Sequence, residues 1–187
     1  MKMTLQVVIE DEDHVPPIVK EVFSLERKNG DLRPETLGLK LDEAKEILAE
    51  VQTMMMTTQA TRFQQQRSSC PDCGKPYPKK GTHQLTCRTL FGTMKLLSQR
   101  FSTCSCHQAK AQRQGQKQLS ASPLAACLAE RTTPECTYLQ TKWAAVMSYE
   151  RTAELLSEVF PLRSQHFYPP FSPLRIRRGD FVLFSPR

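Results

Sequence analysis

The feature that most constrains this 187-residue chain is a set of two cysteine pairs, CPDCG at 70–74 and CSC at 104–106. Two thiolates three residues apart bind one metal ion only if the backbone turns tightly, and Gly74 permits that turn. Between the pairs lie the strand-like runs HQLTCRTL and MKLLSQRF, separated by FGT. A hairpin of this length returns the chain to its start. We therefore predict a zinc ribbon over 70–106, with one structural zinc ion held by Cys70, Cys73, Cys104 and Cys106.

Other interpretations of the cysteines stay open. Redox motifs share Cys-x-x-Cys, a Cys-x-Cys pair is less usual in a ribbon, and His107 can replace Cys106 as the fourth ligand. The four thiols can also be free. Four thiolates leave no open position on the metal, so a catalytic zinc is not expected. Elsewhere, Cys87, Cys127 and Cys136 are expected to pack as small apolar residues, and the remaining histidines to lie on the surface: His14, His83 and His166.

Targeting features are missing from the sequence. There is no run of about 18 apolar residues, so no transmembrane helix and no membrane partner are expected. The start, MKMTLQVVIEDED, turns acidic by Glu10 and does not read as a signal peptide. A cytoplasmic, reducing location follows as the expectation, in which seven cysteines point to metal binding or burial rather than to disulfides.

Positive charge is concentrated where the cysteines are. Residues 1–60 carry a net charge of −5, residues 61–122 carry +10 with Asp72 as their one acid, and residues 123–187 carry +2. Such a basic segment favours a nucleic-acid backbone as partner, although a solvated basic loop has the same composition. The basic residues of the predicted ribbon are the candidate contacts to double-stranded DNA: Lys75, Lys79, Lys80, Arg88, Lys95 and Arg100.

The pattern along the chain predicts an α+β protein. Residues 1–69 form a strand pair (3–9 and 18–26) and a long helix from Leu41 to about Arg67. Its apolar stripe contains Leu41, Ala44, Leu48, Val51 and Met55, widened by Ile47 and Met54, and its polar end is expected to fray. The ribbon occupies 70–106. Residues 107–121, rich in Gln and basic side chains, are expected to form a flexible linker.

Residues 122–162 predict a small helical region that resembles a partial helix-turn-helix. Helices are expected over 123–130, from the Thr133–Pro134 start signal, and from Ser148 to about Phe160. The second and third meet at a short joint, as in a helix-turn-helix, but no base-reading helix follows Pro161. The inward residues are expected to be Cys136, Leu139, Trp143, Val146 and Met147 on the second helix, and Ala153, Leu156 and Phe160 on the third.

Residues 163–187 differ in kind from the rest. They hold four prolines and no helical period, so a divergent, disordered tail is expected. The regularities end together at about Leu162. We interpret this change as a shift of reading frame, beyond which another frame of the gene encodes the continuation; a natural linker, a deletion or an insertion at this point is the alternative.

Three quoted stretches resemble the N-terminal part of bacterial insertion-sequence transposases of the Kra type: CPDCG, GTHQLTCRTLFGTMKLLSQRF with CSC, and ERTTPECTYLQTKWAAVMSY. The resemblance spans about residues 1–162. It implies a zinc-binding and DNA-binding region that precedes a ribonuclease-H-like catalytic domain with an Asp-Asp-Glu triad and divalent metal such as Mg²⁺. No catalytic residue of that domain has a counterpart in this sequence.

The resulting hypothesis is a DNA-binding transposase fragment with a structural zinc ribbon, lacking the catalytic domain and therefore not an enzyme. Its expected partners are double-stranded DNA at the element ends and the full-length transposase. The alternatives are a zinc-ribbon module that contacts protein or RNA, and a remnant without function. No nucleotide-binding or hydrolase motif of the GxGxxG, GxxxxGK[ST], HExxH or GxSxG type is present.

Overall fold

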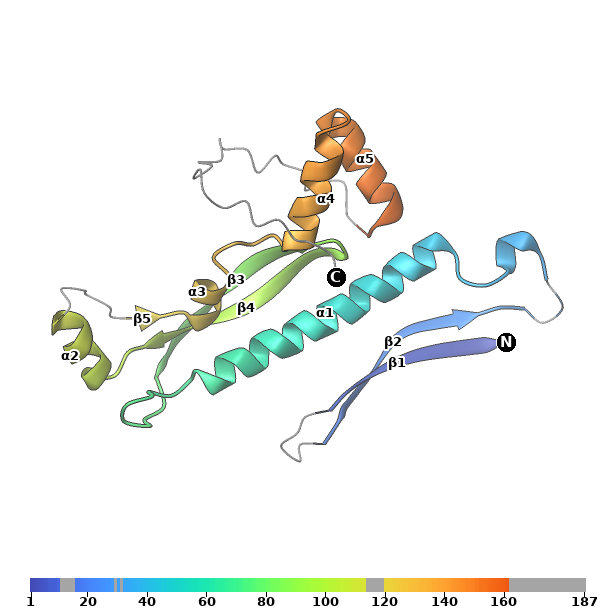
Figure 1. The fold of residues 1–187 in the computed structure, drawn as a ribbon. Helices are drawn as coiled ribbons and strands as arrows, with labels where there is room; N and C mark the ends of the chain where they lie inside the picture. The colour runs from blue at the N-terminus through green and yellow to red at the C-terminus, as the bar shows by residue number, and fades with distance from the viewer. Residues whose placement is uncertain (11–15, 29, 31, 114–119, 162–187) are drawn as a thin grey trace, which may run out of the picture.

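A computed structural model describes residues 1–10, 16–28, 30, 32–113 and 120–161. The chain is an α+β protein with two small antiparallel sheets and a long helix (Figure 1). The expected tail at 163–187, and with it His14, His166 and the segment after Pro161, lie outside the described residues. Among the described residues, no helix is both long and apolar enough to cross a lipid bilayer.

The first sheet is a hairpin of β1 (Lys2–Ile9) and β2 (Ile18–Glu26), as the sequence predicts. It is fastened to the long helix α1 (Leu41–Gln66) by an ion pair, Arg27 to Glu43, at 2.7 Å. Glu43 also accepts a hydrogen bond from the backbone N–H of Lys40, which otherwise lacks an intrahelical partner. The hydrogen bond from Arg27 lowers the pKa of Glu43, so its carboxylate stays ionised at the positive end of the helix.

The second sheet contains β3 (Lys79–Thr89), β4 (Gly92–Ser102) and the short β5 (Ser120–Ala121), in the order β3-β4-β5. Leu90 and Phe91 form the turn between β3 and β4, and Gly92 follows with a positive φ of 121°. Helix α1 and the short helix α3 (Pro123–Cys127) both pack against this hairpin (Figure 1) and bury one of its faces. The core there consists of Ala60, Leu85, Cys87, Leu96 and Leu124.

Gln64 of α1 completes an open edge of this sheet. On the edge of β4 that faces away from β3, only Phe101 and Ser102 are paired with another strand, β5. Further along that edge, the buried Gln64 amide donates to the Leu97 carbonyl at 3.0 Å and accepts from the Gln99 N–H at 2.6 Å. One side chain thus satisfies two backbone groups that would otherwise lack partners.

Replacing Gln64 by leucine is therefore expected to destabilise the protein by about 1–3 kcal/mol, because it leaves those backbone groups buried and unpaired. Urea denaturation measures the change. Gln65→Leu is the matched control, since Gln65 is exposed and its substitution should leave the free energy of unfolding nearly unchanged. Equal effects of the two substitutions would contradict the assigned role of Gln64.

Two further helices pack beyond the hairpin. Residues 131–133 run alongside Arg88 of β3, with the Thr133 N–H donating to the Arg88 carbonyl, and lead into α4 (Pro134–Ala144). Helix α5 (Tyr149–Val159) follows after Ser148, whose hydroxyl accepts from the Arg151 N–H. Both helices start where the sequence predicts. Lys45 of α1 donates to the Ser157 carbonyl, which ties α5 to the long helix.

Several expectations about detail are wrong. In the stripe predicted on α1, Met54 is buried and Ala44, Ile47 and Val51 are half-buried, but Leu41, Leu48 and Met55 are exposed. Ala60 and Gln64, which were not predicted, are buried. The polar end of α1 does not fray, because Ala60 and Gln64 pack against the second sheet. On the last two helices, the inward residues agree except that Val146 is 73% exposed.

The expected linker at 107–121 and the first of the three short helices also differ. Helix α2 (Ser105–Arg113) covers the first part of the linker and β5 its last two residues; residues 114–119 lie outside the described part of the chain. The first short helix ends at Cys127, three residues earlier than expected, and Cys127 is exposed rather than packed. Because these residues are rich in glutamine, a flexible linker was predicted where α2 forms, starting within the second cysteine pair.

Candidate metal centre

The first cysteine pair lies in a tight turn directly after α1. Ser69 and Pro76 form a β-bridge that closes the turn. Within it, the Cys70 N–H donates to the Lys75 carbonyl and the Gly74 N–H donates to the Cys70 carbonyl, both at 2.9 Å. Gly74 has a φ of 67°, a left-handed conformation that glycine adopts readily, and so permits the tight turn as predicted.

The second pair lies where β4 gives way to α2. Cys104 follows the strand by two residues, and Cys106 is in the first turn of the helix. The turn is fixed by Gln108, whose N–H donates to the Cys104 carbonyl at 3.0 Å and whose amide donates to the Thr103 carbonyl at 2.9 Å. The positive end of a helix favours thiolate at these positions.

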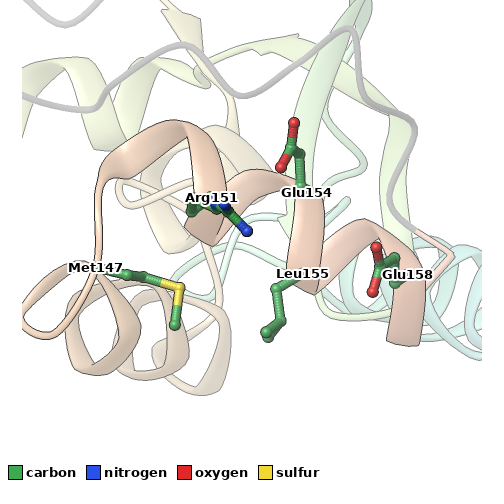
Figure 2. Close-up of a pocket in the computed structure, with 5 residues that line it drawn as sticks. All are labelled: Met147, Arg151, Glu154, Leu155 and Glu158. Atoms are coloured by element: carbon green, nitrogen blue, oxygen red, sulfur yellow. The ribbon is translucent and has the colours of Figure 1, made fainter.

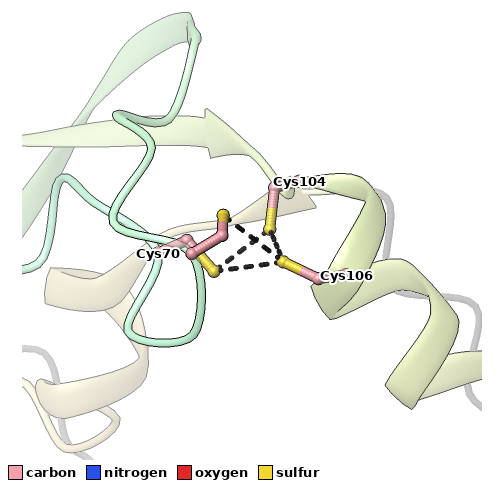
Figure 3. Close-up of side chains that lie close together, drawn as sticks. Cys70, Cys104 and Cys106 are labelled. Atoms are coloured by element: carbon pink, nitrogen blue, oxygen red, sulfur yellow. Dashed lines mark hydrogen bonds between the residues drawn. The ribbon is translucent and has the colours of Figure 1, made fainter.

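The hairpin brings the four sulfur atoms together, three of them labelled in Figure 3. Cys104 Sγ lies 2.8 Å from Cys106 Sγ and 3.1 Å from Cys70 Sγ. Cys106 Sγ lies 3.4 Å from Cys70 Sγ and 3.5 Å from Cys73 Sγ. All four atoms are within 4.8 Å of one another. A tetrahedron of sulfurs about 2.3 Å from a central ion has edges of about 3.8 Å, which lies inside this range. The cluster can therefore hold a metal ion.

The four thiols are not equivalent electrostatically. Hydrogen bonding from the Cys104 thiol, and then from the backbone N–H groups of Cys73 and Asp72, lowers the pKa of Cys70 to about 6. The neighbouring thiols of Cys104, Cys70 and Cys73 raise the pKa of Cys106 to about 12. Without metal, Cys70 ionises first and Cys106 keeps its proton at neutral pH. Metal must displace that proton, so metal affinity falls as the pH falls.

Two aromatic residues support the cluster from the side of the sheet. Burial, followed by the neighbouring Cys70 thiol, raises the pKa of Tyr77, so its hydroxyl stays protonated beside the sulfur. The Tyr77 ring contacts that of Phe101, with centroids 6.4 Å apart. Phe101 is 1% exposed and Cys70 is 2% exposed. Ring packing thus fixes the position of the buried ligand.

Among the described residues, these four cysteines form the only group of Cys, His, Asp or Glu side chains close enough to hold a metal. Cys87 and Cys136 are buried elsewhere, as expected of packing residues. His83 lies on β3, outside the group. The side chain of His107, the alternative fourth ligand, is outside the described part of the structure.

The six basic residues predicted to contact DNA are all exposed, but they do not share one face. Lys79, Lys80 and Arg100 lie near the cysteine end of the hairpin, where Lys79 pairs with Phe101 and Gly81 with Arg100. Arg88 and Lys95 lie towards the other end, on the face opposite the buried Leu85 and Leu96. Lys75 is in the cysteine turn.

A hollow on the helical region has a different character. Figure 2 shows it along α5, lined by Met147, Arg151, Glu154, Leu155 and Glu158. Its two carboxylates outnumber its one guanidinium, so it repels a phosphate backbone more than it attracts one. The positive surface of the chain lies instead on the β3–β4 hairpin.

Comparison of the chain with protein-family models, with curated proteins and with solved structures finds no match.

Proposed function

We propose that this chain is a DNA-binding module that a structural zinc ion organises. The observation on which the proposal rests is the four-sulfur cluster at the base of a hairpin with exposed cations. Zn²⁺ is the ion we assign, because thiolates are soft ligands and zinc prefers four of them in a tetrahedron. A ferrous ion in the same four thiolates is the main competitor. A complete thiolate shell leaves no position for a substrate, and zinc has no redox chemistry, so a zinc ion held here is structural.

Double-stranded DNA is the partner that the charge favours. Residues 61–122 carry +10, and all six cations assigned to the ribbon point into solvent. Contacts from lysine and arginine to phosphates position a protein on the duplex without reading its sequence. The resemblance to the N-terminal part of Kra-type transposases gives the proposal its context, namely binding at the ends of an insertion sequence, alone or together with the full-length transposase. We assign no catalytic role to the described residues.

Titration of fluorescent duplex DNA with the metal-loaded protein at several salt concentrations tests the proposal. Contacts from Lys79, Lys80 and Arg100 to about three phosphates predict that affinity falls about fortyfold between about 50 and 200 mM salt, because bound counterions are released. Specificity for base sequence is expected to be low. Lys20→Gln, which removes an exposed charge from β2, is the control and should leave the affinity unchanged.

The competing roles predict other results. A module that contacts protein or single-stranded RNA should bind duplex DNA no better than a poly-anion such as heparin at equal charge. No binding to duplex at low salt, or binding that does not respond to salt, would contradict the proposed function.

A further inference from the structure

A β-bulge interrupts the hairpin next to the metal centre. Lys79 pairs with Phe101 but Gly81 pairs with Arg100, so Lys80 is the extra residue on β3. Bulges redirect side chains and recur beside functional sites. Gly81 has a φ of 138°, which favours glycine, and a Cβ at this position would meet nothing within 4 Å. The backbone is therefore both distorted and open to solvent here.

The bulge creates a hollow of about 170 Å³ that is lined by Lys80, Gly81, Thr82, His83 and Arg100. Along β4 the alternate residues Met94, Leu96 and Ser98 are buried, and Arg100 is next in that series but is exposed. His83, directly opposite Ser98, is half-buried. The hollow therefore lies on the face that carries the core, at the end where the cover over that core stops.

The lining combines groups that bind phosphate. Arginine presents a planar fork of N–H donors that matches two phosphate oxygens, lysine adds a compact charge, and threonine and histidine add further donors. Within the described residues, neither Lys80 nor Arg100 has an ion-pair partner. The one acid among residues 61–122, Asp72, is not part of the lining. Two unneutralised cations beside one hollow favour an anion over water or a cation.

We propose that this hollow is a phosphate-binding site, with Lys80 and Arg100 as its charged ligands and Thr82 and His83 as neutral donors. The inference rests on the proposed function where it concerns nucleic acid: the bound phosphate would be a phosphodiester of the DNA backbone. The site lies close in sequence to the candidate metal centre, since Arg100 precedes Cys104 by four positions. The same chemistry also accepts free phosphate. Of the six cations predicted to contact DNA, only Lys80 and Arg100 line this hollow. His83, which the sequence predicted to be a surface residue, lines it as well.

Amide NMR spectra of the metal-loaded full chain test the site with two probes, inorganic phosphate and a short DNA duplex. Sodium chloride of matched ionic strength is the reference. Phosphate is expected to shift the amide signals of Gly81, Thr82 and His83, and Lys80→Gln and Arg100→Gln should each abolish those shifts. Lys20→Gln removes the same charge from β2 of the first sheet, away from the hollow, and should preserve them. The spectra themselves show whether each variant is folded.

The duplex probe identifies the source of the phosphate. If the site binds backbone phosphate, duplex shifts the same amides, and Arg100→Gln lowers the slope of log affinity against log salt by about one. Shifts with inorganic phosphate alone would keep the site and remove its nucleic-acid role. Duplex binding that neither variant weakens would likewise remove only the nucleic-acid role, whereas no shift at the hollow with either probe would overturn the proposal.

Discussion

Cys104→Ala is expected to abolish metal binding and to unfold the cysteine turn together with the adjacent ends of β3 and β4. The four sulfurs lie after the end of α1, after the end of β4 and at the start of α2, so an ion shared by them would close the hairpin on itself. Four-thiolate zinc contributes about 10–16 kcal/mol of apparent binding free energy at neutral pH, which in small metal domains is folding free energy. The few buried residues near the cluster do not replace a contribution of that size.

Hydrogen–deuterium exchange, read by mass spectrometry, measures this loss segment by segment. In the Cys104→Ala variant, protection should disappear from the cysteine turn and from the adjacent ends of β3 and β4. Cys127→Ala is the matched control, because Cys127 is an exposed cysteine outside the cluster, and it should retain both metal and protection. Unchanged protection over 70–106 in a metal-free Cys104→Ala protein would show that the ion does not organise the fold.

Phe101→Ala is expected to lower the free energy of unfolding by about 3–5 kcal/mol, the usual cost of removing a fully buried phenylalanine ring. Phe101 is 1% exposed, and its ring contacts that of Tyr77, the residue whose pKa the neighbouring Cys70 thiol raises. Its loss should therefore also loosen the metal site, so that a chelator removes the ion faster from the variant.

Leu97→Ala is the control on the same strand. Leu97 is 62% exposed, so its truncation should cost less than about 0.5 kcal/mol. Chemical denaturation monitored by circular dichroism gives the stabilities, and a competition with a colorimetric chelator gives the rate of metal release. A Phe101→Ala variant as stable as Leu97→Ala would contradict the packing described around the cluster.

The elements with strong local signals could be predicted from the sequence. The β1–β2 hairpin, the start of α1 and the starts of α4 and α5 depend on alternation and capping within a few residues, and the structure has each of them. The grouping of the four cysteines was also predictable, because a hairpin of that length must return the chain to its start. The identity of the ion remains a prediction.

The face of α1 that becomes buried could not be predicted, and Gln64 shows why. The apolar stripe at Leu41, Leu48 and Met55 has a regular spacing, so pattern alone favoured it. The structure leaves these three residues exposed and buries Gln64, because the open edge of β4 offers backbone groups that a polar side chain satisfies. That edge is formed by residues more than thirty positions away, and local pattern contains no information about it.

The bulge at Lys80 is a similar case. In the sequence, Lys79, Lys80 and Arg100 were three of six equivalent cations, and His83 was a surface residue. Only the shift in strand register brings Lys80, His83 and Arg100 to one hollow. The charge composition of residues 61–122 predicted a negatively charged partner. The position of the binding site within this segment depended on how β3 and β4 pair.

X-ray absorption at the zinc edge, together with elemental analysis of the purified and reduced chain, tests the central claim most directly. The account predicts about one zinc per chain, surrounded by four sulfur atoms at about 2.3 Å. A shell of three sulfurs and one nitrogen would mean that a histidine, and not Cys106, is the fourth ligand. A folded, reduced sample that contains no zinc would contradict the account.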